Sequence, residues 1–489
     1  MSNFSDLSVG LSGLEAQQVG LDTVGQNVAN ANTPGYVEER AQLGAVGSVQ
    51  HLGFDESASK EPGNGVEVAG AQRLSNTYLQ QRSYTEQGNQ GMLSAQQSGL
   101  QAVQENFPEP STTGISAQLT QFWQDWSTLA NNPSDGPTRA TLVQDATSLT
   151  SSLNQTSTAL TTLSQQTVQG MTGTLSEVNQ ETAQIASLNQ SMLQGTAGSG
   201  NANELADQRD QLISQLSSQI GVNVTYNGDG TANVYAGSEA LVSGVNSQKL
   251  SLSSSGPPYS LVFSQDQSSF QPSSGQLAGS LTVVNQYVPG YQASLDQVAQ
   301  SLMGSVNHLM STGYDLNGDQ GSPFFLGTGA SDSEVNPAVV ADPSLIAAAA
   351  APTASGSSAT NQDGSIAAEV GELPNSATVT LEEPSGGWST GASSSSWSGS
   401  TTTTGPEADV AYNQLVTGVG QATSSVNNNL TNQQAVTTNV NSALQSATGV
   451  NTDEEMTNMV MYQNAYDASA KFISTVDTVL QTLVSMVYG

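Results

Sequence analysis

The chain has 489 residues, enough for several domains. Its 8 basic residues stand against 41 acidic ones, for a formal charge of -33. Such a surface repels phosphate backbones and anionic lipid headgroups, which argues against nucleic-acid and membrane partners. The sequence contains no cysteine, and this excludes a disulfide framework and a thiolate metal site.

The acidic bias is unusual because charged residues make up only 10% of the chain. One hypothesis is that the folded protein works in an acidic medium. Its carboxylates are then protonated, and few basic groups remain to repel one another. The alternative is compositional drift in the lineage.

The N-terminal segment, residues 1–36, is predicted to be a helix that ends at Asn32-Thr33-Pro34-Gly35, where proline and glycine stop the helical pattern. Apolar or small residues recur along it in steps of three and four, which is the spacing of a coiled-coil seam. The seam runs through Phe4, Leu7, Leu11, Leu14, Leu21, Gly25 and Val28.

The middle of the chain alternates between helical and strand-like patterns. Helix breakers divide the first helical stretch at Pro108–Gly114, Asn131–Pro137 and Gly195–Gly200. In chain order we expect a small β excursion at 37–73, a helical domain at 74–221, a β-rich insertion at 222–275, a long helix at 276–314, and a second β-rich insertion, rich in Ser, Gly and Thr, at 315–405.

The C-terminal segment, residues 406–489, is again helical and carries its own seam. The seam residues are Met459, Tyr462, Tyr466, Ile473, Val476, Leu480, Leu483 and Val487. A chain with a pairing seam at each end is expected to bring its ends together. The predicted fold class is therefore α+β: a helical rod domain built from both chain ends, with two inserted β-rich domains.

No enzyme constellation is complete. Gly387-Trp388-Ser389-Thr390-Gly391 has the spacing of a nucleophile elbow, but a poor helix follows and no histidine comes later. The only histidines are His51 and His308, so the sequence lacks the two histidines four residues apart that a zinc-binding helix needs. We therefore expect no enzyme activity, no metal and no cofactor.

The N-terminus has neither a basic nor an apolar stretch of the kind a signal peptide needs, and the first basic residue is Arg40. The longest apolar run, 345–351, is too short to span a bilayer. We expect a protein that is cytoplasmic or exported without a cleaved signal, with no membrane insertion.

Several motifs in the sequence resemble those of known protein families. The string from Asn27 to Tyr36, NVANANTPGY, closely resembles the N-terminal signature of the flagellar rod, hook and hook-associated protein superfamily. Within it, other segments are similar to the hook-associated protein 1 family of hook–filament junction proteins. These are Asp207–Leu212, Gly275–Gly279, Gly313–Gly318, Phe324-Phe325, Asn451–Met456 and Tyr462–Tyr466.

This resemblance implies a structural adaptor outside the cell, at the hook–filament junction of the bacterial flagellum. It implies export by the flagellar type III apparatus with an export chaperone, and a helical homo-oligomer between hook protein and the second junction protein. The expected assembly interface comprises both seams, apart from Phe4 and Gly25, and the signature residues Asn30, Asn32, Pro34, Gly35 and Tyr36.

Two other assignments stay open at this point. One is another axial protein of the superfamily, a hook or distal rod protein. The other is an extracellular adhesin whose β insertions are the active part. On the favoured assignment, residues 1–35 and 456–489 are needed for incorporation, whereas the second insertion tolerates a deletion of residues 340–400.

Overall fold

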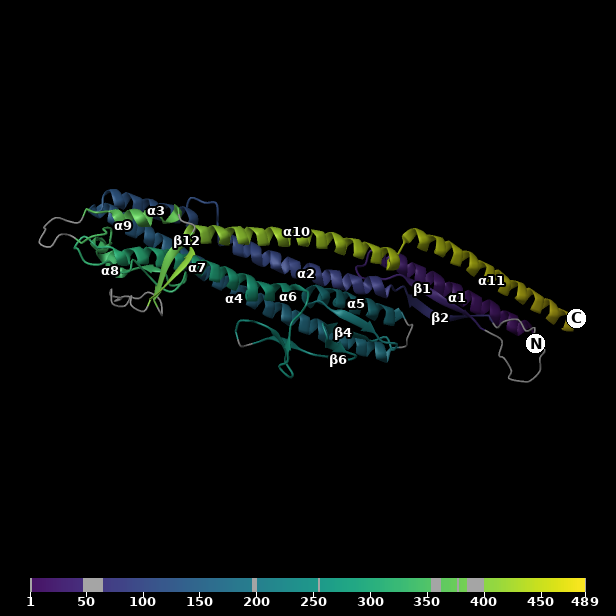
Figure 1. Cartoon of the computed structure of the whole chain (residues 1–489). Coiled ribbons are helices and arrows are strands. Elements are labelled where there is room, and N and C mark those ends of the chain that lie inside the picture. Colours follow the sequence, from purple (N-terminus) through teal and green to yellow (C-terminus); the bar gives the residue numbers. More distant parts are fainter. Residues whose placement is uncertain are drawn as a thin grey trace.

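The structure is a computed structural model, and it describes residues 2–46, 65–195, 200–253, 256–352, 362–375, 378–384 and 400–488. The molecule is long and narrow: a pair of terminal helices forms one end, and a thicker helical body with small sheets extends to the other (Figure 1). Helices and small antiparallel sheets coexist in one rod, so the predicted α+β class is confirmed.

The terminal unit joins the two ends of the chain. Helix α1 (Ser2–Asn30) and helix α11 (Thr452–Tyr488) run antiparallel beside each other, so both termini lie at the same tip (Figure 1). Strands β1 (Glu39–Ala45) and β2 (Val66–Arg73) form an antiparallel hairpin that also packs on α1. This hairpin is the β excursion expected after the first helix.

The body is a bundle of long helices. Helix breakers separate the first four, and Asp135 caps the longest of them, α4, by accepting a hydrogen bond from the amide of Thr138. The helix that returns after the first insertion contains one π-helical turn, Val283–Tyr287, which ends two residues before Pro289. The body helices are α2 (Thr77–Glu105), α3 (Ile115–Asn131), α4 (Gly136–Gln194), α5 (Gly200–Ile220), α6 (Gln276–Thr282), α7 (Val288–Thr312) and α10 (Ala408–Thr448).

The first insertion forms two small antiparallel sheets on the side of α4 and α5. A four-stranded meander has the order β3-β4-β5-β6, and a three-stranded one has the order β7-β8-β9. Their inward residues complete a core with α4, α5 and α6. The strands are β3 (Asn223–Tyr226), β4 (Ala232–Ala236), β5 (Glu239–Ser243), β6 (Asn246–Ser247), β7 (Leu250–Leu252), β8 (Leu261–Phe263) and β9 (Ser269–Phe270).

The second insertion mixes short helices with short strands, although its sequence predicted a non-helical stretch. Its described elements are β10 (Phe325–Leu326), β11 (Glu334–Val335), α8 (Pro337–Ala341), α9 (Ser365–Gly371), β12 (Thr378–Pro384) and β13 (Ser400–Pro406). The nucleophile-elbow spacing at 387–391 lies outside the described residues.

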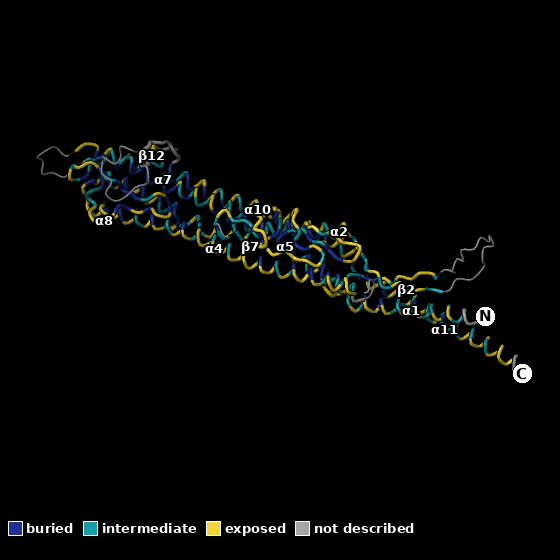
Figure 2. The backbone as a smooth tube through the Cα atoms, turned by 90° about the horizontal axis from the view of Figure 1, so that it is seen from below, coloured by how far each residue is buried: buried dark blue, intermediate teal, exposed yellow. Residues whose placement is uncertain are grey.

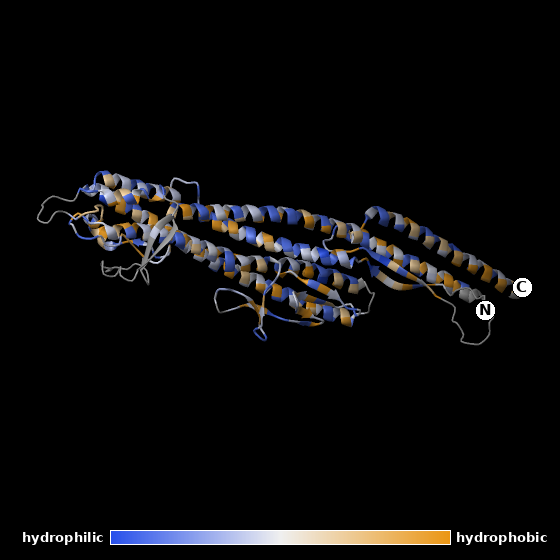
Figure 3. Ribbon diagram, in the orientation of Figure 1, coloured by the Kyte–Doolittle hydropathy of each residue, from blue (hydrophilic) through white to orange (hydrophobic). Residues whose placement is uncertain are grey.

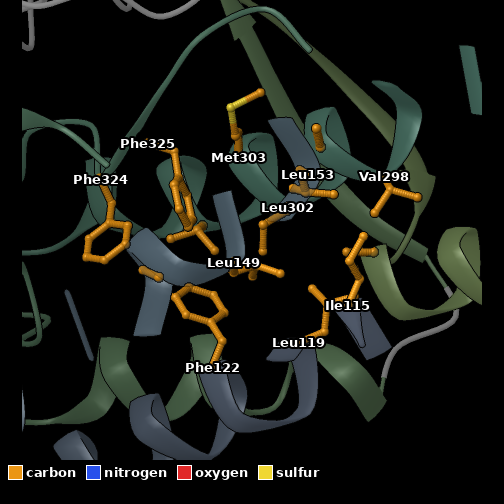
Figure 4. Packing of buried hydrophobic residues seen from close by; sticks show 14 of the residues in the cluster. Ile115, Leu119, Phe122, Leu149, Leu153, Val298, Leu302, Met303, Phe324 and Phe325 are labelled. Carbon is orange, nitrogen blue, oxygen red and sulfur yellow. The ribbon is translucent and has the colours of Figure 1, made fainter. Parts of the chain in front are cut away.

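The second insertion is also part of the main core rather than an appendage. Phe324 and Phe325 lie against Phe122 of α3, with ring centroids 6.2 and 5.6 Å away (Figure 4). Ile346 and Ile366 are buried in the same cluster. The expectation that residues 340–400 can be deleted without loss is therefore revised, because that deletion removes core side chains.

Candidate assembly interface

The contact between α1 and α11 follows a line of glycines on α1. A methyl group added at Gly20 would lie 2.5 Å from the ring of Tyr462, and one added at Gly10 would lie 2.8 Å from Ile473. Gly13 lies against Ser469 in the same antiparallel register. The helices approach closely because α1 has glycines, which lack a side chain, opposite the large side chains of α11.

The leucines of α1 are not the centre of this contact. Ala16 and Val24 are buried beside the glycine line, whereas Leu11 is 50% exposed. Leu11 and Leu21 each come one position after a glycine of this line, Gly10 and Gly20. One position along a helix turns the side chain by about 100° around the helix axis, so these leucines point away from the glycine line. Gly25, also in the predicted seam, has open space in front of it.

On α11 the structure does bring the predicted seam against α1. Tyr462 and Ile473 contact glycines of α1, as described above, and their neighbours along the seam are half-buried. A second series of apolar residues lies on the same helix, about a quarter-turn around the helix axis from the predicted seam. Its members are spaced 11, 7, 4 and 3 residues apart. We call it the outer strip; it consists of Met461, Phe472, Val479, Leu483 and Met486, which are all exposed.

The burial of the predicted interface residues falls into three groups. Half-buried are Leu7, Leu14, Leu21, Val28, Asn30, Tyr36, Met459, Tyr462, Tyr466, Ile473, Val476 and Leu480. Exposed are Leu11, Asn32, Pro34, Gly35 and Leu483. The side chain of Val487 lies outside the described residues.

The signature string closes the end of α1 around one buried amide. Asn27 donates from Nδ2 to the carbonyl of Glu39 over 2.8 Å. Its Oδ1 accepts from the Glu39 amide at 3.0 Å and from the Tyr36 hydroxyl at 2.9 Å. Asn27 is the first residue of the signature string but was not among the predicted interface residues. Its three hydrogen bonds fix the turn that leads from α1 into β1.

Carboxyl groups crowd this same corner. Glu38, Glu39 and Glu455 are buried, and burial is the main cause that raises the pKa of Glu39 and of Glu455. The exposed Arg40 pairs with Glu38 at 2.7 Å and with Glu454 at 3.2 Å, across the start of α11. The corner thus ties α1, β1 and α11 to one another.

A largely buried ion-pair cluster joins the terminal unit to the body. Arg73, the last residue of β2, contacts Asp207 at 2.5 Å and Asp210 at 2.8 Å, both on α5. The amide of Val37 also donates to Asp207, over 3.4 Å. Sequence reasoning missed Arg73; the available signal was its rarity, as one of eight basic residues.

The third charged residue of the same α5 motif, Arg209, binds the first insertion. It donates from Nη1 to the carbonyl of Gly230 over 2.6 Å, and its guanidinium lies 5.2 Å from the ring centre of Tyr226. Tyr226 in turn donates to Asp210 over 3.1 Å. The motif at Asp207–Leu212 is therefore a joint between the terminal hairpin, α5 and the first insertion.

Two kinds of site were not found in the part of the chain that the structure describes. There, no three acidic or histidine side chains are arranged to hold a metal ion. Nor is any described helix both long enough and apolar enough to cross a bilayer.

Comparisons with known proteins show which proteins this chain is similar to. Residues 100–325 match the sequence model of the flagellar hook-associated protein FlgK helical domain. Residues 7–36 match that of the flagella basal body rod protein, and residues 439–486 that of the flagellar basal body rod FlgEFG protein C-terminal region. Flagellar hook-associated protein 1 of Bacillus subtilis (strain 168) is 25% identical over 523 residues, which cover 99% of this chain and 98% of that protein. These matches support the assignment of the chain to flagellar hook-associated protein 1.

Other proteins named flagellar hook-associated protein 1 agree over a shorter stretch. The protein of Escherichia coli (strain K12) is 27% identical over 328 residues, 64% of this chain and 58% of its own length. The structure of the flagellar hook junction protein FlgK from Burkholderia pseudomallei superposes with a TM-score of 0.58 at 17% identity, covering 75% of this chain and all of that one. That likeness establishes the fold.

The relatives and the family models together decide the class of protein. The chain is a structural axial protein of the bacterial flagellum at the hook–filament junction, and it associates with other axial components. The assignment to hook-associated protein 1, rather than to hook or distal rod protein, is the one that the helical-domain match supports.

Proposed function

We propose that copies of this chain polymerise on the tip of the hook through the exposed apolar faces of α1 and α11. The polymer joins hook protein on one side to the second junction protein on the other. The chain reaches this place outside the cell through the flagellar type III export apparatus with its chaperone, and it has no catalytic role. The resemblance and the family support the setting; the terminal unit supports the interface.

The observation that carries the proposal is the apolar surface of the terminal unit. Among the residues that the structure describes, nine of the 16 exposed large hydrophobic side chains lie on α1 or α11. Hydrophobic residues recur along both helices (Figure 3), while the well-buried residues concentrate in the body (Figure 2). An exposed apolar surface of this extent marks a protein–protein contact.

The contact inside the chain leaves most of this surface free. Leu11 of α1 and most of the outer strip of α11 remain uncovered, whereas the other leucines of α1 are partly covered and Phe472 also lies against Gly10. A pair of helices held by one narrow line gains little from packing, so neighbouring copies would add most of its stability.

The two free surfaces also explain an open array. The leucines of α1 and the outer strip of α11 are different surfaces, so their contact between copies is heterologous. Heterologous contacts that do not close into a ring extend as a helical array. This is the geometry that a tubular junction on the hook requires.

The test introduces one charge into the outer strip. Val479→Asp is compared with Thr478→Asp, its exposed neighbour on a different face of α11. Each variant is expressed in a strain that lacks its own copy of the gene. Swimming, attached filaments and the amount of protein in the culture medium are measured.

We expect Val479→Asp to abolish attached filaments and to accumulate in the medium, because it is exported but not incorporated. Thr478→Asp should support filaments as the unsubstituted chain does. Normal filaments with Val479→Asp would show that the outer strip is not an interface.

A further inference from the structure

Two carboxyl groups at the distal end of the body are buried with one oxygen lacking a donor. Oδ2 of Asp125, on α3, and Oε1 of Glu407, the residue before α10, are enclosed without a hydrogen-bond donor. A carboxylate in this position carries negative charge that no protein donor compensates at the enclosed oxygen, whereas a protonated carboxyl group does not. Each of the two faces a second carboxyl group.

The first pair joins α3 to α4. Asp125 is only 7% exposed, and its Oδ1 accepts from Gln121 over 2.8 Å. The charged group that faces it from α4 is the half-buried Asp145. Burial, followed by the hydrogen bond to Asp145, raises the pKa of Asp125 to about 6.

The second pair lies at the start of α10. Glu407 is 1% exposed and uses Oε2 to accept from the amides of Asp409 and Val410. The neighbouring carboxyl group is Asp409, whose Oδ2 accepts from Nε1 of Trp123 over 2.6 Å. Burial, and then the charge of Asp409, raises the pKa of Glu407 to about 8.

Basic groups do not offset these charges. Among α3, α4 and α10 the sequence contains one basic residue, Arg139. Its guanidinium donates to the carbonyls of Pro133, Pro343 and Ile346. Close to the second pair, Glu109 accepts from the hydroxyl of Tyr412 over 3.1 Å, and it adds another acid rather than a cation.

Helix α3 connects the two pairs. Trp123 holds the pair at α10, and Asp125, two residues later, belongs to the pair with α4. We propose that a proton shared within each carboxyl pair fastens α3 between α4 and α10, so that the distal end of this protein is built to be most stable in acid.

The direction of the pH dependence follows from linkage. A carboxyl group whose pKa is higher in the folded state than in the unfolded one binds more protons when folded. Its contribution is fully present below the unfolded pKa, about 4, and is lost as the pH rises through the folded values of about 6 and about 8. The formal charge of -33 at pH 7 acts in the same direction, because acid removes the self-repulsion.

The experiment follows the thermal unfolding of the full chain between pH 4 and pH 9. We compare the unsubstituted chain with Asp125→Asn, Glu407→Gln and the double variant. Glu369→Gln, which changes an exposed carboxyl group on α9, is the matched control. Infrared spectra at pH 5 to 8 record whether protonated carboxyl groups persist in the folded protein.

We expect the unfolding temperature of the unsubstituted chain to fall by several degrees across this range. Asp125→Asn should flatten the fall near pH 6 and Glu407→Gln the fall near pH 8, while Glu369→Gln keeps the full slope. An unfolding temperature that rises or stays level with pH overturns the proposal, as does an infrared spectrum without protonated carboxyl groups at pH 5 to 6. That spectrum decides even if a variant does not fold.

A third result would also overturn it. If calcium at pH 7 restores the unfolding temperature of the unsubstituted chain but not of Asp125→Asn, the pair binds a cation rather than a proton. None of these outcomes depends on filament formation, so the shared protons and the assembly interface are tested separately.

Discussion

The ring of Tyr462 lies directly over the backbone of Gly20, so close that a methyl group on Gly20 would be 2.5 Å from it. This contact sets the antiparallel register of the two terminal helices. It also shows that the pairing face of α1 is made by its smallest residues. The leucines that dominate the sequence pattern lie beside it.

Gly20→Ala should loosen the helix pair. The added methyl group forces the ring of Tyr462 or the α1 backbone to move, a change that costs about 1–3 kcal/mol when a packed contact is overfilled. Amide hydrogen exchange in α1 and α11 of the full chain is the measurement, and we expect faster exchange in both helices. Gly25→Ala is the control: with open space at that position, exchange should stay the same or slow down. Equal effects of the two substitutions would contradict the glycine contact line.

Asn27→Ala should destabilise the turn between α1 and β1. The substitution leaves the amide and the carbonyl of Glu39 without their partner in a buried site. Each unsatisfied buried group costs about 1–3 kcal/mol. Denaturant unfolding of the chain, together with proteolysis of the terminal unit, measures the loss. Asn32→Ala, at an exposed position in the same string, should change neither, and a comparable loss there would refute the role of Asn27.

Arg73→Gln should release the terminal unit from the body. It takes the cation from the largely buried Asp207 and leaves Asp210 with Arg209 alone, 3.5 Å away. Removing one partner of a buried ion pair costs about 3–5 kcal/mol. Small-angle X-ray scattering should show a broader range of orientations of the terminal unit. Arg82→Gln breaks the pair with Glu86 one turn away on a helix surface, which is worth about 0.3–0.5 kcal/mol, and should leave the scattering profile unchanged. A rigid rod in Arg73→Gln would rule out the joint.

Deletion of residues 340–400 should prevent the distal core from folding. Ile346 and Ile366 are fully or almost fully buried, and loss of one such side chain costs about 2–5 kcal/mol. Circular dichroism and yield of soluble protein measure the result. A shorter deletion within the Ser/Gly/Thr-rich tract, residues 387–398, keeps every described residue of this core and should be tolerated. If the long deletion folds as well as the short one, the second insertion is not part of the core.

Much of the architecture could be predicted from the sequence. The helix breaks at Pro108–Gly114 and Asn131–Pro137 act locally, since proline and glycine interrupt a helix wherever they stand, and α2, α3 and α4 begin and end beside them. The string from Asn27 to Tyr36 indicated the family without any structure, and the comparisons agree with it.

What the sequence could not settle is which faces and which charges meet. Hydrophobic periodicity marks an apolar stripe, but Gly10 and Gly20 add no apolar side chain to it, and their value appears only when α11 lies 2.5–2.8 Å from their missing methyl groups. Likewise, Asp125 and Asp145 are 20 positions apart and on different helices, so nothing in their order along the chain pairs them. Local pattern alone determined the long helices, their ends and the family resemblance. The pairing line and the meeting of Asp125 with Asp145 were decided by tertiary packing, because they depend on distances between segments that the sequence does not encode locally.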